Sequence, residues 1–301
     1  MSRDTESNLH CGFAAVVGRP NVGKSTLINA LLMRKVSITS PKPQTTRHRI
    51  LGIKNTSDAQ IVFVDTPGIN YAETRALNRY MNRAAHGAIE DVDVVVFVVE
   101  AMRWTDQDQR VADRIQASKR ATILVLNKVD RVRPRSELLP FIDRLAKDHG
   151  FEEIVPVSAR SGDNLEALES AIKQYLPKGE RLFPEDMVSD RGERFVAAEL
   201  IREKLILRLE QEVPYRLSVE IEDMSVRNEV LHISAIIWVE RAGQKTIVIG
   251  RKGELLKRVG SSARGEMQKL FGQKVDLRLW VKIKDDWSDN DRALAALGYV
   301  D

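Results

Sequence analysis

Short apolar runs alternate with segments of helical periodicity through the first 180 residues of the chain. The apolar runs predict strands near residues 13–17, 50–55, 61–65, 94–99, 122–126 and 154–158. Apolar residues at helical spacing predict helices near 25–33, 75–89, 106–118, 136–149 and 164–176. This alternation is typical of an α/β fold, in which a doubly wound, mostly parallel sheet is covered by helices on both faces.

The second half follows a different pattern, which favours a separate α+β domain. An amphipathic helix is predicted over 193–212, and alternating strands over 216–222 and 230–240. A loop at 250–253 lies between two helical stretches, with further helix at 254–259 and 262–271, and a last strand is predicted at 275–283. We therefore expect a disordered N-terminus at 1–10, a first domain at 11–179, a linker at 180–192 and a second domain at 193–301.

A phosphate loop follows the strand predicted at 13–17. It reads Gly18, Arg19, Pro20, Asn21, Val22, Gly23, Lys24 and Ser25, a full G-x-x-x-x-G-K-S motif, and Thr26 continues into the next helix. A strand, a glycine-rich turn and a helix N-terminus form an anion site from backbone N–H groups and the helix dipole. Lys24 is expected to reach the β- and γ-phosphates, and the Ser25 hydroxyl to ligate Mg²⁺. By itself the motif indicates a nucleoside triphosphate of any base.

The segment Asn127, Lys128, Val129 and Asp130 indicates which base is bound. An ionised carboxylate only accepts hydrogen bonds, so Asp130 can accept from two neighbouring N–H groups on the guanine edge. Adenine has no such donor pair there, and the sequence therefore predicts GTP. The strand predicted at 154–158 ends in Ser158, and Ala159 comes directly after it. This pair is expected to support the guanine through backbone groups, although an ordinary loop exit would look the same.

Two segments between these motifs are expected to contact Mg²⁺ and the γ-phosphate. The first is Asp65, Thr66, Pro67 and Gly68, where the carboxylate can hold Mg²⁺ through water and the glycine N–H can approach the phosphate. The second is the polar stretch 40–49, which predicts a mobile loop. We choose Thr46 over Thr45 as its Mg²⁺ ligand. The alternative for this stretch is a solvated basic linker.

Catalysis is thus assigned to Lys24, Thr46, Asp65 and Gly68, without a glutamine to orient the attacking water. The residue after Gly68 is Ile69, whose side chain cannot hold water. Hydrolysis is then assisted by backbone groups, by a partner or by a second cation. Asn21 can offer an oxygen to a monovalent ion such as K⁺, which would act electrostatically like an arginine finger. A loop-stabilising hydrogen bond is an equal alternative for Asn21.

A basic segment lies in the second half. Residues 241–280 hold ten Lys and Arg against three Asp and Glu, whereas the whole chain carries a formal charge of only +4. This concentration is typical of a polyanion site. Within it, the loop Gly250, Arg251, Lys252 and Gly253 has the G-x-x-G form with which KH domains clamp about four nucleotides of single-stranded nucleic acid. Lys257 and Arg258 follow on the next helix and are expected to join the RNA site. The alternative is a helix-to-helix turn with solvated basic residues.

Composition excludes several other classes of protein. The single cysteine, Cys11, excludes an internal disulfide and a cysteine-based zinc site. The polar N-terminus lacks the apolar core of a signal peptide, and the apolar stretch at 92–99 is far too short to span a membrane. We therefore expect a cytoplasmic protein. We also expect it to be a monomer.

Taken together, these motifs resemble the Era family of bacterial ribosome-assembly GTPases, which join a P-loop GTPase domain to a type II KH domain. The resemblance rests on 18–25, 44–47, 65–68, 127–130, 158–159, 183–186, 249–253, 279–282 and 297–299, and covers nearly the whole chain after residue 10. It implies hydrolysis of GTP to GDP with Mg²⁺, binding of the KH domain near the 3′ end of small-subunit ribosomal RNA, and assistance to assembly of that subunit. It also implies peripheral association with the inner membrane, for which the sequence shows no amphipathic helix or lipidation motif.

Two other functions compete with this one. A GTPase acting on another RNA would share the same motifs, although the single P-loop argues against tandem-domain ribosomal GTPases. An RNA-binding scaffold that binds GTP without turnover is disfavoured by the intact Lys24, Ser25 and Asp65.

Overall fold

The computed structural model describes residues 9–68 and 75–299, which form two compact units. Within that part of the chain, the first unit holds 9–37, 46–68 and 81–190, and the second holds 38–45, 75–80 and 191–299. The predicted fold class, a doubly wound α/β domain followed by an α+β domain, is confirmed. The finer domain boundaries stay a prediction. Of the N-terminus expected to be disordered, residues 1–8 lie outside the described residues, while His10 begins the first strand.

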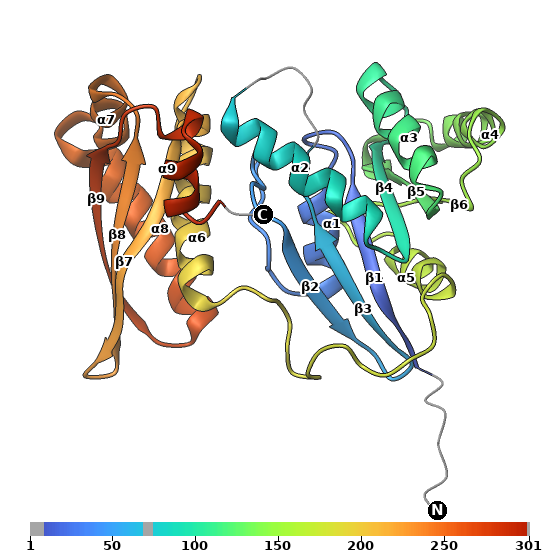
Figure 1. Cartoon of the computed structure of the whole chain (residues 1–301), viewed down its shortest axis with the longest axis horizontal. Coiled ribbons are helices and arrows are strands. Elements are labelled where there is room, and N and C mark those ends of the chain that lie inside the picture. Colours follow the sequence, from blue (N-terminus) through green and yellow to red (C-terminus); the bar gives the residue numbers. More distant parts are fainter. Residues whose placement is uncertain (1–8, 69–74, 300–301) are drawn as a thin grey trace, which may run out of the picture. The chain divides into compact units, whose positions relative to one another are not determined.

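The first unit is built on a six-stranded sheet (Figure 1). Its strands are β1 (His10–Val17), β2 (Ile50–Asn55), β3 (Ala59–Asp65), β4 (Val94–Glu100), β5 (Ala121–Asn127) and β6 (Glu153–Pro156). They lie in the order β2-β3-β1-β4-β5-β6. β2 runs antiparallel to β3, and the other neighbouring strands are parallel.

Alternate residues of the buried strands face opposite layers of helices. In β1, Ala14 and Val16 pack with α1 (Lys24–Leu32) and α5 (Leu165–Gln174). Ala15 and Val17 belong to the other layer, with α2 (Ala76–Glu90), α3 (Asp106–Ser118) and α4 (Leu138–Asp148). Because both faces are covered, the strands are nearly continuous apolar runs rather than alternating ones, which is why they stand out in the sequence.

The parallel strands direct their carboxyl ends to one edge of the sheet, where ligands bind in open α/β folds. β1 leads there into the phosphate loop, β3 ends at Asp65 and β5 ends at Asn127. β6 ends at Pro156, so Ser158 and Ala159 lie in the loop beyond the strand rather than at its end. The fold thus gathers the four nucleotide motifs at this edge.

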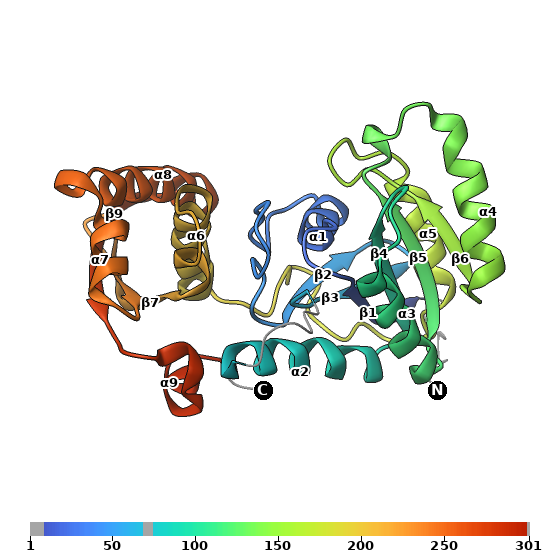
Figure 2. The ribbon, with the colours of Figure 1, turned by 90° about the horizontal axis from the view of Figure 1, so that it is seen from above.

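The second unit has a three-stranded sheet with helices packed on one face (Figures 1 and 2). Its strands β7 (Leu217–Arg227), β8 (Val230–Val239) and β9 (Lys274–Ile283) lie in that order, with β7 antiparallel and β9 parallel to β8. The helices are α6 (Glu193–Arg208), α7 (Ala242–Ile249) and α8 (Glu254–Phe271). The resulting α-β-β-α-α-β order is the predicted one. A short helix, α9 (Asp291–Ala296), follows β9 and was not predicted.

Three elements of this unit differ from the sequence prediction. α6 ends at Arg208 and not at residue 212, because Leu209 adopts an extended backbone. α8 is one continuous helix and not two, because Val259, Ala263 and Met267 are all buried along one side and hold it to the core through the Gly-Ser-Ser segment. β7 extends to Arg227 because it stays paired with β8 beyond an irregularity between Ile221 and Asp223. Within the described residues, no helix has both the length and the apolar character that crossing a membrane requires.

Candidate functional site

The phosphate loop adopts a backbone that only glycine accommodates at two positions. Gly18 has φ 147° and Gly23 has φ 105°. A Cβ on Gly18 would lie 2.3 Å from the carbonyl oxygen of Val98, and one on Gly23 would lie 2.3 Å from Nδ2 of Asn127. α1 begins at Lys24, so the unpaired N–H groups of its first turn, which includes Ser25 and Thr26, are available to an anion.

Lys24 is buried inside the loop. Its ammonium group donates to the carbonyl oxygens of Gly18 (3.0 Å) and Arg19 (3.2 Å). Burial lowers the pKa of Lys24 to about 8, although the nearby carboxylate of Asp65 opposes this change. Among the described residues, the hydrogen bonds of this buried cation go to neutral carbonyl groups, which leaves its charge well suited to meet a phosphate.

Three oxygen-bearing side chains from separate segments meet beside Lys24. The Ser25 hydroxyl donates to Oδ2 of Asp65 (2.9 Å) and lies 2.8 Å from Oγ1 of Thr46. Oγ1 of Thr46 is in turn 3.5 Å from Oδ2 of Asp65. The other carboxylate oxygen, Oδ1, is buried and accepts no hydrogen bond within the described residues. Burial raises the pKa of Asp65, against the opposing effect of the Lys24 charge and the neighbouring hydroxyls.

Thr45 and Thr46 have different surroundings. Thr46 is buried beside Ser25 and Asp65. Thr45 belongs to the second unit, where its hydroxyl contacts Ser40 (2.7 Å) and the carbonyl oxygen of Lys42 (2.7 Å). Of the two threonines, the structure therefore brings only Thr46 to the phosphate loop.

The segment after β5 braces the phosphate loop from the side. Asn127 donates through Nδ2 to the carbonyl oxygen of Val22 (2.8 Å) and accepts through Oδ1 from the N–H of Ala159 (3.0 Å). Lys128 donates to the carbonyl oxygen of Asn21 (2.9 Å) and pairs with Glu100 (3.1 Å). These contacts join three of the four nucleotide motifs into one structure.

The carboxylate of Asp130 is held for base recognition. The Ser158 hydroxyl donates to Oδ1 of Asp130 (2.7 Å), and Ser158 is fully buried. The backbone N–H of Val129 donates to the carbonyl oxygen of Val157 (3.2 Å). Asp130 itself is only half-buried, so its other oxygen can meet a base from outside.

The segment after β3 also packs against the phosphate loop. Thr66 donates through its hydroxyl to the carbonyl oxygen of Val16 (2.9 Å). Pro67 follows, and a Cβ on Gly68 would lie 2.9 Å from N and Cα of Pro20. Gly68 can thus lie directly against the phosphate loop only because it lacks a side chain. Ile69 lies outside the described residues.

The second candidate site is the loop between α7 and α8. Gly250 (φ 74°), Lys252 (φ 51°) and Gly253 (φ 78°) all have left-handed φ. A Cβ on Gly250 would lie 2.7 Å from Cβ of Leu255, whereas nothing lies within 4 Å of one on Gly253. Arg251 and Lys252 are exposed at the tip of this turn, where their charges face solvent.

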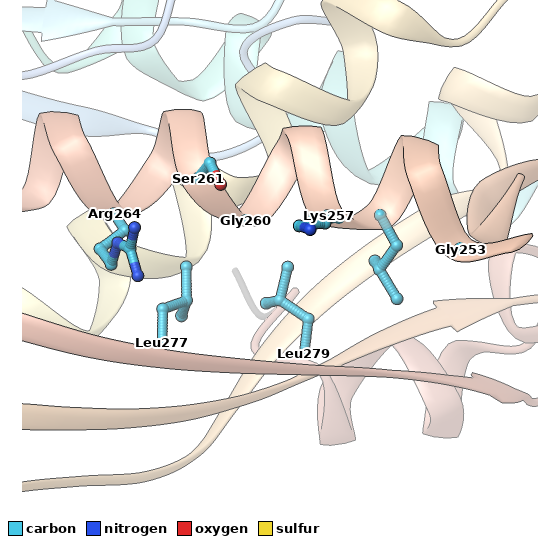
Figure 3. Close-up of a pocket in the computed structure, with 8 residues that line it drawn as sticks. Gly253, Lys257, Gly260, Ser261, Arg264, Leu277 and Leu279 are labelled. Carbon is cyan, nitrogen blue, oxygen red and sulfur yellow. The ribbon is translucent and has the colours of Figure 1, made fainter.

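A groove of about 460 Å³ runs from this loop between α8 and β9 (Figure 3). It is lined by Gly253, Leu256, Lys257, Gly260, Ser261 and Arg264 on the helix side, and by Leu277 and Leu279 on β9. A Cβ on Gly260 would be 3.4 Å from Cδ1 of Leu279, so this glycine lets the helix and the strand approach each other. The groove combines apolar walls with two cations, which suits bases and phosphates.

Comparison with known proteins places both sites in one family. A family model described as "50S ribosome-binding GTPase" matches residues 13–128, and a KH domain model matches residues 212–288. GTPase Era of Azotobacter vinelandii is 54% identical over 296 residues, covering 98% of this chain and 99% of that protein. GTPase Era of Pseudomonas entomophila is 53% identical over 301 residues, covering 100% of both.

The chain belongs to the Era family. It is therefore a GTPase with a KH domain, as the motifs predicted. Two solved Era structures match it, each with a TM-score of 0.94 and 42% sequence identity over 97% of this chain. One is Era in complex with MgGDPNP and nucleotides 1506–1542 of 16S ribosomal RNA, of which 99% is covered. The other is a variant of Aquifex aeolicus Era bound to GDP·AlF4⁻, of which 100% is covered.

In this Era-family chain, two of the predicted site residues point elsewhere. Arg19 donates through Nε to both carboxylate oxygens of Asp108 (3.1 Å each) and pairs with Glu100 (3.5 Å), so its side chain braces the loop. Arg258 is not among the groove residues. It is exposed and pairs with Glu254 (3.7 Å), because adjacent helix positions face different directions.

Sequence reasoning also missed residues that both sites use. Asp108 and Thr105 together form a capping box at the start of α3. The Thr-x-x-Asp pattern could have predicted this helix N-terminus. Nothing in the sequence showed that Asp108 also holds Arg19. In the groove, Gly260, Ser261 and Arg264 were missed. A signal did exist, since 253, 257, 260, 261 and 264 follow helical spacing along one face.

Proposed function

We propose that this GTPase binds GTP with Asp130 reading guanine and Lys24 contacting the β- and γ-phosphates. The observation that carries this proposal is the hydrogen-bonded brace of Asn127, Lys128 and Ser158 around the phosphate loop and Asp130. It fixes the distance between base reader and phosphate loop before any ligand arrives, which reduces the ordering cost of binding. GDP·AlF4⁻ in the Aquifex aeolicus relative supports turnover at this site.

Mg²⁺ fits the cluster of Ser25, Thr46 and Asp65. All three offer oxygen, which is the ligand atom Mg²⁺ prefers, and the buried Oδ1 of Asp65 has an unused acceptor capacity. When bound, Mg²⁺ would neutralise the charge that develops on the phosphate oxygens. The relative solved with MgGDPNP supports this assignment. Gly68, against Pro20, is suited to offer its N–H to the γ-phosphate.

A monovalent cation at Asn21 is a further part of the proposal. Asn21 has φ 65° and is exposed, so its side-chain oxygen is open to an ion from solvent, while its carbonyl oxygen accepts from Lys128. Hydrolysis is expected to be faster in potassium than in sodium, and the difference is expected to vanish in Asn21→Ala. Equal rates in both salts for the parent protein would remove K⁺ from the mechanism.

The second unit is proposed to bind the 3′ region of 16S ribosomal RNA and to assist assembly of the small ribosomal subunit. The groove between α8 and β9, joined to the Gly250–Gly253 turn, carries this assignment. The Era relative solved with nucleotides 1506–1542 of 16S ribosomal RNA supports the identity of the RNA. The resemblance also underlies the proposal that the protein associates peripherally with the inner membrane. That the protein acts as a monomer is a separate proposal.

A second candidate is action on the large subunit, which the description "50S ribosome-binding GTPase" of the family model favours. Sedimentation of the GTP-bound protein with purified subunits separates the two functions. Co-sedimentation with 30S particles supports the proposal, whereas binding to 50S particles alone would replace it with the second candidate.

The decisive experiment on the RNA site is the double variant Arg251→Asp with Lys252→Asp. Reversing two exposed charges at the turn should lower affinity for single-stranded 16S 3′ RNA sharply and flatten its salt dependence, because fewer counterions are released. GTP affinity, measured on the same preparation, should not change. RNA binding that keeps the parental salt slope would contradict the KH assignment.

A further inference from the structure

β9 is an edge strand whose two faces have different surroundings. Leu277 and Leu279 point toward α8 and line the groove (Figure 3). Since successive strand residues point to opposite faces, Arg278, Trp280 and Lys282 lie on the face away from the helices. Only the width of one strand separates the groove from this second row of side chains.

Trp280 is the most unusual member of that row. Its side chain is 43% exposed, although tryptophan is normally buried or half-buried. Trp280 takes part in the β8–β9 ladder through its backbone, but its indole makes no hydrogen bond or ring contact with other described residues. Its register partner on β8 is the buried Ile236 (4% exposed), which lies on the same face of the sheet. This leaves a large aromatic surface facing solvent.

Trp238, two residues further along β8, differs in this respect. Its Nε1 donates to Glu220 (2.7 Å), and the ammonium groups of Lys282 and Lys284 lie 6.0 and 5.7 Å from its ring centre. Trp238 is therefore already engaged, and it gathers two cations next to Trp280. One indole of the pair holds the cations while the other is available.

The charges of this row are only weakly neutralised. Arg278 pairs with Asp276 (3.4 Å) and Lys282 pairs with Glu222 (3.7 Å). Both pairs are largely exposed, and such pairs contribute little free energy. A phosphate can therefore compete with the carboxylates for these cations. An exposed aromatic ring flanked by available cations is the arrangement that binds single-stranded nucleic acid.

We propose that Arg278, Trp280, Lys282 and Lys284, here called the β9 outer strip, bind single-stranded RNA that leaves the groove around the edge of β9. Trp280 stacks on one base, and the cations contact the flanking phosphates. The inference rests on the proposed RNA-binding function of the groove. It adds a second contact site, which lengthens the recognised RNA beyond the about four nucleotides of a KH groove. The exposed indole, set among cations that only exposed ion pairs neutralise, favours RNA over a protein partner.

The test compares two lengths of RNA. A four-nucleotide RNA fills the groove alone, and the same RNA extended by about six nucleotides at either end can reach the β9 outer strip. Trp280→Ala should lower affinity for one of the extended RNAs about tenfold, the loss of one stacked base, and leave the short RNA unaffected. Trp280→Phe should restore most of the loss. Val226→Ala, which removes another exposed apolar side chain from this sheet, is the matched control and should change neither affinity.

The outcomes distinguish the two proposals. If the parent protein binds neither RNA, the proposed function fails and this inference fails with it. If the parent binds both RNAs and Trp280→Ala affects neither, or affects both equally, the groove stands and the outer strip is refuted. Loss of binding to ribosomal particles, with binding to extended naked RNA intact, would show that the strip meets a protein instead. Quenching of tryptophan fluorescence by extended RNA, absent in Trp280→Phe, would support stacking directly.

Discussion

The nucleotide site and the RNA groove differ in how completely each is built before its ligand binds. In the first, Lys24, Asp65, Asn127 and Ser158 are buried and bonded to their neighbours. In the second, Arg251 and Lys252 are exposed, and the groove walls come from one helix and one strand. The nucleotide site is thus a buried network of hydrogen bonds, whereas the groove is an open surface.

This difference governs how each site should respond to mutation. In a buried network each atom has fixed partners, so one misfitted atom disturbs several contacts at once. On an open surface each side chain acts through its own contact with the ligand, and losses should be smaller and closer to additive. The predictions below set matched changes in the two regions against each other.

The largest expected contrast comes from glycine-to-alanine changes. Gly18→Ala should abolish GTP binding and lower the free energy of unfolding by several kcal/mol, because its Cβ would lie 2.3 Å from a backbone oxygen that cannot move aside. Gly253→Ala should cost only about 1 kcal/mol, the price of left-handed φ for alanine, since its Cβ meets nothing within 4 Å. Thermal unfolding and nucleotide titration of both variants measure the contrast.

Gly250→Ala serves as the control within the RNA loop. Its Cβ would lie 2.7 Å from Cβ of Leu255, so it should be clearly more damaging to RNA binding than Gly253→Ala. If all three substitutions lower stability and ligand binding equally, the close contacts around Gly18 are not the reason why the nucleotide site tolerates no side chain there.

The next effect concerns base selection. Asp130→Asn should weaken GTP binding about a hundredfold and improve binding of xanthosine triphosphate, because xanthine replaces a donor with an oxygen. Ser158→Ala removes the hydroxyl that orients Asp130 (2.7 Å) and should weaken GTP binding about fivefold without changing the preferred base. Titration of each variant with GTP and with xanthosine triphosphate measures the preference. An unchanged preference for GTP in Asp130→Asn would refute the assignment of Asp130 as the residue that recognises guanine.

An effect of similar size, on stability rather than on binding, follows from the burial of Lys24. Its pKa is lowered from 10.5 to about 8 by burial, so between those values the unfolded chain binds more protons than the folded one. Stability of the nucleotide-free protein should therefore rise relative to Lys24→Met, by about 2 to 3 kcal/mol, as pH increases from about 8 to 10.5. Chemical denaturation across this pH range measures the difference in free energy of unfolding between the parent protein and Lys24→Met. If that difference does not change with pH, Lys24 is not desolvated.

Lys173 provides a control of opposite sign. Burial lowers the pKa of Lys173, but hydrogen bonds to Asp58 and Glu169 outweigh this effect, so the pKa is raised overall. Its stabilising contribution is therefore present below the unfolded pKa and is lost as pH rises through the folded one. Lys173→Met should approach the stability of the parent protein at high pH, whereas the parent protein should become more stable relative to Lys24→Met.

The same contrast explains what the sequence could predict. The phosphate loop could be predicted because the residues that bind phosphate are contiguous in the sequence. The buried strands could be predicted because strands such as β4 are apolar on both faces. Thr46 was preferred over Thr45 by pattern alone, and only the fold shows that the two hydroxyls have different partners. Contacts between distant segments, such as Arg19 with Asp108, leave no local signal.

The groove was harder to predict because its residues are dispersed along one helix face. The G-x-x-G turn and the charge of 241–280 indicated the region, but not which cations face the RNA. Two basic neighbours, Lys257 and Arg258, look equivalent in the sequence. α8 is continuous through this segment, and its rotation of about 100° per residue separates them.

That separation gives the smallest and most specific prediction. Lys257→Gln should lower affinity for the four-nucleotide RNA about threefold and reduce the salt slope by about 0.7, the value for one phosphate contact on a single strand. Arg258→Gln removes the same charge one residue later, where the side chain is exposed and pairs with Glu254 (3.7 Å), and should change neither quantity. RNA titrations at several salt concentrations test both variants. Equal losses in both would mean that RNA responds to the overall charge of α8, and that the groove does not select its ligand by position.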